Sequence, residues 1–261
     1  MRTSPIPNTT LAPSALCWGT TEFGSTIDRR AAFALLDAYT AAGGNFIDTA
    51  KVYGDWVPGQ VSPSEKIIGE WLKARGNRGR IILATKGAHY HLDAPHVRRL
   101  KPADIVSDLD ASLRHLQSDV IDLYWLHRDD PARPVAEIIQ TLEAQVAAGK
   151  IRYYGASNWR IDRLAEAEAV ARATGAQGFC AISNLWSLAR VDTAAFQDPT
   201  MVAMDDPLWA YHLARNLAAI PYTSQAHGVF HKLAAGQTDA IPELYRKMFV
   251  NRETEARAAR V

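Results

Sequence analysis

Four polar residues in the first half of the chain have the types and spacing to donate a proton to a substrate. They are Asp48, Tyr53, Lys86 and His127. A tyrosine has a pKa of about 10 and is a weak acid near neutral pH, but a neighbouring ammonium such as that of Lys86 would stabilise the phenolate. Asp48 would keep the lysine charged and oriented, and His127 could hold a substrate carbonyl or share the proton.

Such a group supplies a proton but neither electrons nor a strong nucleophile. Reduction of a carbonyl would therefore need a hydride from a bound nicotinamide. Each residue alone also has an ordinary structural explanation, because an aspartate after a strand often caps a turn and a lysine there extends into solvent. If the fold brings all four residues together, a catalytic role is favoured over these separate structural roles.

The elements that must position these residues are short apolar runs, and Asp48, Lys86 and His127 each end one. Seven such runs occur, at residues 15–18, 45–48, 80–86, 120–127, 151–157, 179–184 and 219–224. Amphipathic helices separate them, and successive runs begin roughly 30 to 40 residues apart, the size of a βαβ repeat.

Sequence signals mark the termini of several helices between the runs. Ala32, Leu36 and Tyr39 recur with helical spacing before Gly43. Residues 62–65, Ser-Pro-Ser-Glu, predict a capping box. Residues 206–207, Asp-Pro, predict the start of a later helix. Two further helical segments are expected, around 244–249 and from 251 onward.

Strands that alternate with helices predict an α/β fold with a parallel sheet. A doubly wound sheet would need a glycine-rich phosphate turn, and neither GxGxxG nor GxxxxGK[ST] occurs. A closed (β/α) barrel places reactive residues at the carboxyl ends of its strands, which is where three of the four candidates stand.

Composition narrows the possible partners. The 261 residues include 29 basic and 28 acidic ones, so nothing favours binding of nucleic acid or a membrane surface. Two cysteines cannot form a disulfide framework or a four-ligand zinc site. No apolar run reaches the roughly 18 residues that span a bilayer, and residues 1–12 lack a signal-peptide core. We expect a cytoplasmic protein with a small-molecule partner, and its oligomeric state stays open.

Three ordered motifs resemble those of the aldo-keto reductase superfamily, over about residues 11–230. The first comprises Asn45 to Ala50, Tyr53-Gly54, Ser64-Glu65 and Ile68-Gly69; the second runs from Leu113 to His127; the third runs from Gly149 to Asn158. The resemblance implies a (β/α)8 TIM barrel of this type, as one domain over 1–261. It also implies reversible reduction of an aldehyde or ketone, with Tyr53 as general acid, Lys86 and Asp48 tuning it, and His127 orienting the carbonyl.

The resemblance also implies a nicotinamide cofactor, NADPH more than NADH. The residues expected to contact it are Gly19, Thr20, Asp48, Ser157, Asn158, Ser183, Trp186, Tyr222, Thr223 and Ser224. Ser183 departs from the family's usual glutamine, and Gln225 stands where leucine is common. Only seven of the eight barrel strands are found, so we hypothesise that the chain lacks a C-terminal βα unit and is truncated.

Some residues are also compatible with other functions. His89-Tyr90-His91 could suggest a metal site, but no third ligand is well placed with it. These residues are expected to line the substrate mouth instead, with Trp56 and Tyr90 as apolar walls. The polar loop that begins at Arg128 favours a polar carbonyl substrate. A nicotinamide-binding regulatory subunit, like the potassium-channel β subunits, or an inactive fragment remains an alternative.

Overall fold

Seven parallel strands form one sheet in which the strand order follows the chain. The computed structural model describes residues 1–260, and its strands run in the order β1 to β7. They are β1 Trp18–Gly19, β2 Phe46–Asp48, β3 Ile82–Gly87, β4 Ile121–Leu126, β5 Ile151–Ser157, β6 Ala181–Ser183 and β7 Ala218–Ala219. Within residues 1–260 there is no eighth strand and β1 does not pair with β7, so the sheet is an open, incomplete barrel. The predicted α/β fold with seven strands is confirmed.

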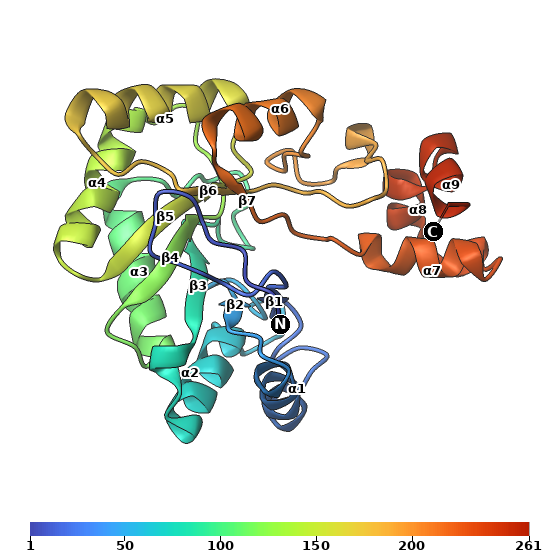
Figure 1. Cartoon of the computed structure of the whole chain (residues 1–261), viewed down its shortest axis with the longest axis horizontal. Helices are drawn as coiled ribbons and strands as arrows, with labels where there is room; N and C mark the ends of the chain where they lie inside the picture. Colours follow the sequence, from blue (N-terminus) through green and yellow to red (C-terminus); the bar gives the residue numbers. More distant parts are fainter. Residues whose placement is uncertain (261) are drawn as a thin grey trace.

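Helices follow the strands and cover one face of the sheet (Figure 1). They are α1 Arg29–Ala41, α2 Pro63–Arg75, α3 Pro102–Leu116, α4 Val135–Ala147, α5 Ile161–Thr174 and α6 Asp206–Arg215. The side chain of Asp28 caps α1 by accepting from the Ala31 amide. Asp205 caps α6 by accepting from the Leu208 amide, so the cap lies one residue before the predicted Asp-Pro pair.

The predicted capping box at residues 62–65 is wrong. Ser62 has a φ of 48° and its side chain makes no capping hydrogen bond. Glu65 turns instead toward the neighbouring elements, where it accepts from the Thr85 hydroxyl at 2.6 Å and pairs with His115 Nδ1 at 3.0 Å. A buried carboxylate takes these stronger partners because an uncompensated charge inside a protein is costly.

The core has two layers because alternate side chains of a strand point to opposite faces. Along β4, Tyr124 and Leu126 pack in a large apolar cluster with residues of the covering helices. Leu123 and Trp125 pack in a second cluster that contains no helix residues but includes Ile6 from the N-terminal segment. The N-terminal segment therefore packs on the sheet face that the helices leave free.

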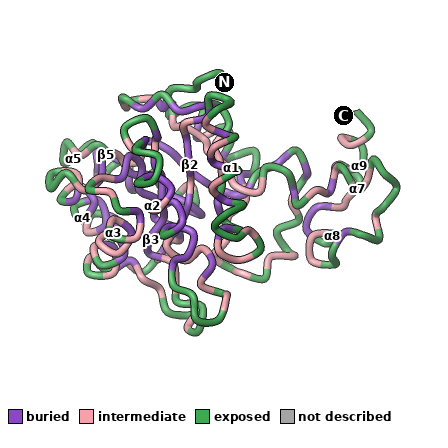
Figure 2. Tube along the Cα trace, turned by 90° about the horizontal axis from the view of Figure 1, so that it is seen from below, coloured by how far each residue is buried: buried purple, intermediate pink, exposed green. Residues whose placement is uncertain are grey.

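The C-terminal helices form a third, smaller cluster. Helices α7 Val229–Ala234, α8 Glu243–Phe249 and α9 Arg252–Ala258 pack with the segment between β6 and α6. Figure 1 shows them standing apart from α1–α6, and Figure 2 shows how little buried chain they contain. The two predicted helical segments near 244–249 and after 251 are confirmed, whereas α7 was not predicted. No helix in the described part of the chain is long and apolar enough to cross a bilayer.

Candidate active site

A buried ion pair lies at the carboxyl ends of β2 and β3. Only 2% of Lys86 is exposed, and its ammonium binds the Asp48 carboxylate and donates to the Thr49 carbonyl at 3.0 Å. The Trp125 indole N–H donates to the other Asp48 oxygen at 3.0 Å. Burial opposes the lysine's charge, but the Asp48 carboxylate and Tyr53 together outweigh it and raise the pKa of Lys86 above its ordinary value. Lys86 is therefore a fixed cation inside the barrel.

Tyr53 lies over this cation. A turn in which the Tyr53 amide donates to the Ala50 carbonyl at 3.0 Å follows β2 directly, and it brings the phenol ring to 5.1 Å from Lys86 Nζ. The His127 ring meets the Tyr53 ring edge-on, with centroids 5.9 Å apart. The structure thus brings together all four residues that the sequence singled out for proton transfer.

His127 is a neutral imidazole in this setting. It follows β4, and its amide donates to the Gly87 carbonyl at 2.9 Å. Burial lowers the pKa of His127 well below its ordinary range, and His89, Arg128 and Lys86 act in the same direction. Its Nδ1 atom has no hydrogen-bond partner among residues 1–260. A neutral ring can donate one N–H to a carbonyl oxygen without adding a second charge beside Lys86.

Two hydroxyls and an amide that are expected to contact the nicotinamide cofactor lie at the ends of β5 and β6. Ser157 donates to the Ser183 carbonyl at 2.7 Å, and the Asn158 side-chain amide donates to the His127 carbonyl at 3.2 Å. The side-chain oxygen of Asn158 accepts from the Tyr222 hydroxyl at 2.7 Å. Ser157, Asn158, Ser183 and Tyr222 therefore form one group beside His127.

Gly19 and Thr20, at the end of β1, adjoin Asp48. Gly19 pairs with Asp48 across the sheet, and the Thr20 amide and hydroxyl both donate to the Asp48 carbonyl at 3.1 Å. Beyond β7, Thr223 adopts a φ of 61°, and no side-chain hydrogen bond is found for Thr223 or Ser224 within the described residues. These two are placed near the site only through their neighbour Tyr222.

The ring of Trp186, a residue expected to contact the nicotinamide cofactor, packs against another tryptophan. Trp186 is 37% exposed, and its ring stacks on Trp209 of α6, with centroids 5.4 Å apart and planes 22° apart. Its amide donates to the Tyr222 carbonyl at 3.3 Å. The backbone of Trp186 thus adjoins the candidate cofactor site, and one face of its ring is already covered.

The expected substrate-mouth residues separate into two groups. Tyr90 and Arg128 come together because both bind Asp198, from the segment between β6 and α6. Trp56 is 46% exposed and does not line the neighbouring cavity. The sequence does not point to Asp198, because an aspartate in an irregular segment belongs to no recognisable motif or periodic pattern.

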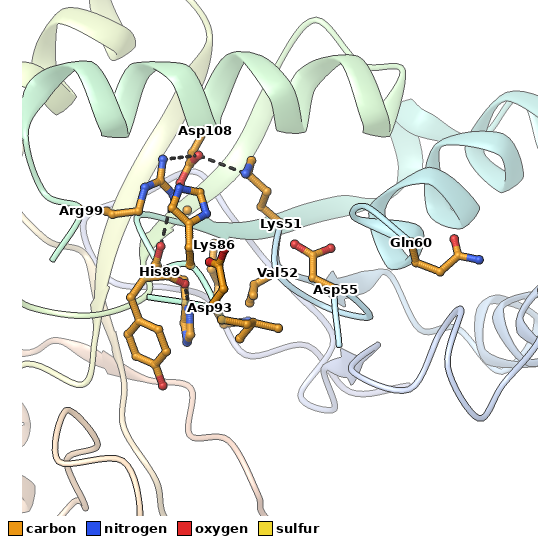
Figure 3. Close-up of a pocket in the computed structure, with 13 residues that line it drawn as sticks. Lys51, Val52, Asp55, Gln60, Lys86, His89, Asp93, Arg99 and Asp108 are labelled. Atoms are coloured by element: carbon orange, nitrogen blue, oxygen red, sulfur yellow. Dashed lines mark hydrogen bonds and ion pairs between the residues drawn. The ribbon is translucent and has the colours of Figure 1, made fainter. Parts of the chain in front are cut away.

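The neighbouring cavity has a volume of about 300 Å³ and lies between the loops that follow β2 and β3 (Figure 3). Lys86 and His89 line its inner side, and Gln60 lies farther out. Asp108 binds Arg99 at 2.7 Å and Lys51 at 3.2 Å across the cavity. Most of the residues that line it have polar or charged side chains. Within residues 1–260, no group of three or more histidines, cysteines and acidic residues is placed to hold a metal ion.

Comparison with known proteins identifies the family. Residues 15–258 match the model of the aldo/keto reductase family. The chain is 36% identical over 197 residues to a norsolorinic acid reductase of Emericella nidulans, which covers 70% of this chain and 49% of that protein. It is 35% identical over 177 residues to an aryl-alcohol dehydrogenase (NADP⁺) of Phanerodontia chrysosporium, covering 64% of this chain and 44% of that protein.

A bacterial relative matches this chain with similar identity and coverage. The chain is 34% identical over 175 residues to the aldo-keto reductase YhdN of Bacillus subtilis, covering 66% of this chain and 51% of that protein. The chain spans about half the length of the curated relatives it matches. With the strand order and the residues at the strand ends, these matches show that the chain belongs to the aldo/keto reductase family.

Proposed function

We propose that this protein reduces an aldehyde or ketone to an alcohol, using NADPH and a proton from Tyr53. The observation that carries the proposal is the position of the Tyr53 ring, 5.1 Å from the buried Lys86 ammonium and edge-on to His127. A fixed cation stabilises the phenolate that remains after the proton has left. The name of the aryl-alcohol relative, which includes NADP⁺, supports both the reaction class and the cofactor.

The residues beside His127 fit a nicotinamide in their chemistry. A carboxamide needs donors for its oxygen and acceptors for its nitrogen. The Ser183 hydroxyl can serve as either, whereas the Ser157 hydroxyl, which donates to the Ser183 carbonyl, can serve as an acceptor. The Ser183 side chain lies at the end of β6, only 4% of this residue is exposed, and no hydrogen bond is found for its hydroxyl within residues 1–260. Ser157, Asn158 and Ser183 would hold the carboxamide, and NADPH, when bound, supplies the hydride.

Side chains of the protein perform the other steps of the reaction. His127, kept neutral by burial, donates a hydrogen bond that orients the substrate carbonyl. Tyr53 donates its proton to the carbonyl oxygen as negative charge develops there. Lys86 stabilises the resulting phenolate, and Asp48 holds the Lys86 ammonium in place. Trp125 fixes Asp48 through its indole N–H, so the charged pair is held in position before substrate arrives.

Two measurements on the whole chain test the proposal. Fluorescence titration with NADPH measures cofactor binding, and the loss of NADPH absorbance with and without benzaldehyde measures reduction. We expect micromolar binding and aldehyde-dependent oxidation of NADPH. Binding of NADPH without aldehyde-dependent oxidation would refute the proposed reductase activity and favour a regulatory subunit. Absence of NADPH binding would refute both the reductase and the regulatory subunit.

A further inference from the structure

Asp198 joins three loops at the mouth of the candidate active site. One oxygen of its carboxylate accepts from the Tyr90 hydroxyl at 2.9 Å and from Arg128 Nη2 and Nε at 3.0 and 3.3 Å. The other oxygen accepts from the Thr200 amide at 2.8 Å and the Thr200 hydroxyl at 2.6 Å. Both oxygens are thus fully used, and these hydrogen bonds and Arg128 hold the pKa of Asp198 at about 2 against the effect of its burial.

This pair lies next to the groups proposed to do the chemistry. Arg128 directly follows His127, and its Nη1 donates to the His127 carbonyl at 2.9 Å. The side chains of Arg128 and Asp198 are only 13% and 18% exposed. The His89 ring lies 4.7 Å from the His127 ring, centroid to centroid, and Tyr90, the residue after His89, donates to Asp198. Arg128 and Asp198 therefore lie beside His127 at the mouth of the site.

The lysines and the arginine that line the neighbouring cavity are also paired. Lys86 binds Asp48, and Lys51 and Arg99 bind Asp108. Arg128 is the basic residue that adjoins His127 directly, and Asp198 neutralises it. A guanidinium is otherwise well suited to bind a carboxylate through two parallel hydrogen bonds.

We propose that Asp198 is a specificity-determining residue that neutralises Arg128 and thereby restricts the site to uncharged aldehydes and ketones. This proposal rests on the proposed function, because it assumes that the substrate carbonyl lies at Tyr53 and His127. The rest of the substrate then extends over Tyr90 and Arg128. A substrate carrying a carboxylate there meets the Asp198 carboxylate, and like charges at close range disfavour binding.

Calorimetric titration with benzoate and benzamide tests this proposal without requiring turnover. The two ligands have nearly the same shape and differ in charge. Asp198→Asn keeps one of the two acceptor oxygens and removes the charge, so we expect benzoate affinity to rise about tenfold or more relative to benzamide affinity. Asp192→Asn is the matched control, since Asp192 lies in the same segment and caps Ala194 rather than binding Arg128. It should leave the benzoate-to-benzamide ratio unchanged.

Arg128→Gln gives an independent test with the opposite sign. It leaves the Asp198 carboxylate without its cation, so the benzoate-to-benzamide ratio should fall below that of the wild type. An unchanged ratio in both variants, or an equal rise in Asp192→Asn, would overturn the proposal. Because ligand binding is measured directly, a protein that lacks reductase activity but shows these shifts would refute the proposed function and leave the charge selectivity standing.

Discussion

Replacing Lys86 by methionine would leave the Asp48 carboxylate in the barrel interior without its ammonium partner. The Trp125 N–H would then be the remaining side-chain donor to Asp48. Breaking a buried ion pair by removing one partner costs about 3–5 kcal/mol, because the other charge stays uncompensated. We therefore expect Lys86→Met to lower the free energy of unfolding by about that amount at pH 8.

The loss should depend on pH in a defined direction. Burial already raises the pKa of Asp48, and Lys86 is the largest opposing influence. Without Lys86, the folded-state pKa of this carboxyl rises further above its unfolded value. A group of this kind stabilises the fold below its unfolded pKa, and the stabilisation is lost as the pH rises through the folded pKa. The destabilisation should thus be smaller at pH 5 than at pH 8 by more than about 1.4 kcal/mol, the worth of one pKa unit.

Urea unfolding followed by tryptophan fluorescence measures both quantities, since the chain has seven tryptophans. Lys150→Met is the matched control, because it breaks the pair with Asp110, whose side chains are 34% and 38% exposed. Such a surface pair contributes about 0–1 kcal/mol. A loss below about 1 kcal/mol for Lys86→Met at pH 8, or a loss that does not change with pH, would refute the reasoning about this pair.

Two further substitutions test the packing that supports the site. In Gly87→Ala, the new Cβ would lie 1.9 Å from the buried Tyr124 hydroxyl, so we expect a loss of about 1–3 kcal/mol or more in urea unfolding; wild-type stability would contradict the packing. Tyr154→Phe removes a phenol that donates to Glu143 at 2.6 Å and accepts from the Gly178 amide at 2.9 Å. It should cost about 1–3 kcal/mol, measured in the same way, and a neutral effect would count against these hydrogen bonds.

The sequence was most informative where one strand end carries one polar residue. Asp48 and Lys86 end apolar runs, so a parallel sheet necessarily brings them to the same edge, and the structure confirms their placement. A short turn connects β2 to Tyr53, so the position of Tyr53 relative to Asp48 is constrained. Strand lengths were less predictable. The first expected run, 15–18, contributes only Trp18 to the two-residue strand β1, since pairing depends on the neighbouring strand as well as on apolarity.

The contacts that the sequence did not reveal are those between distant loops. Asp198 lies 70 residues from Arg128 along the chain, in a segment without helical or strand periodicity. The failed capping box has a similar cause, because Glu65 binds Thr85 and His115 on other elements rather than its own helix terminus. Trp186 stacks on a tryptophan of α6, a contact that local pattern cannot specify.

The most direct test of the central claim, that Tyr53 donates the proton, is the rate of benzaldehyde reduction by Tyr53→Phe at saturating NADPH. Tyr211→Phe is the control, since the Tyr211 hydroxyl binds Glu168 on α5, away from the group at the strand ends. Loss of a general acid lowers the rate by about 10²- to 10⁴-fold, and we expect that loss with NADPH affinity maintained. A Tyr53→Phe protein that reduces benzaldehyde as fast as the Tyr211→Phe control would contradict the account.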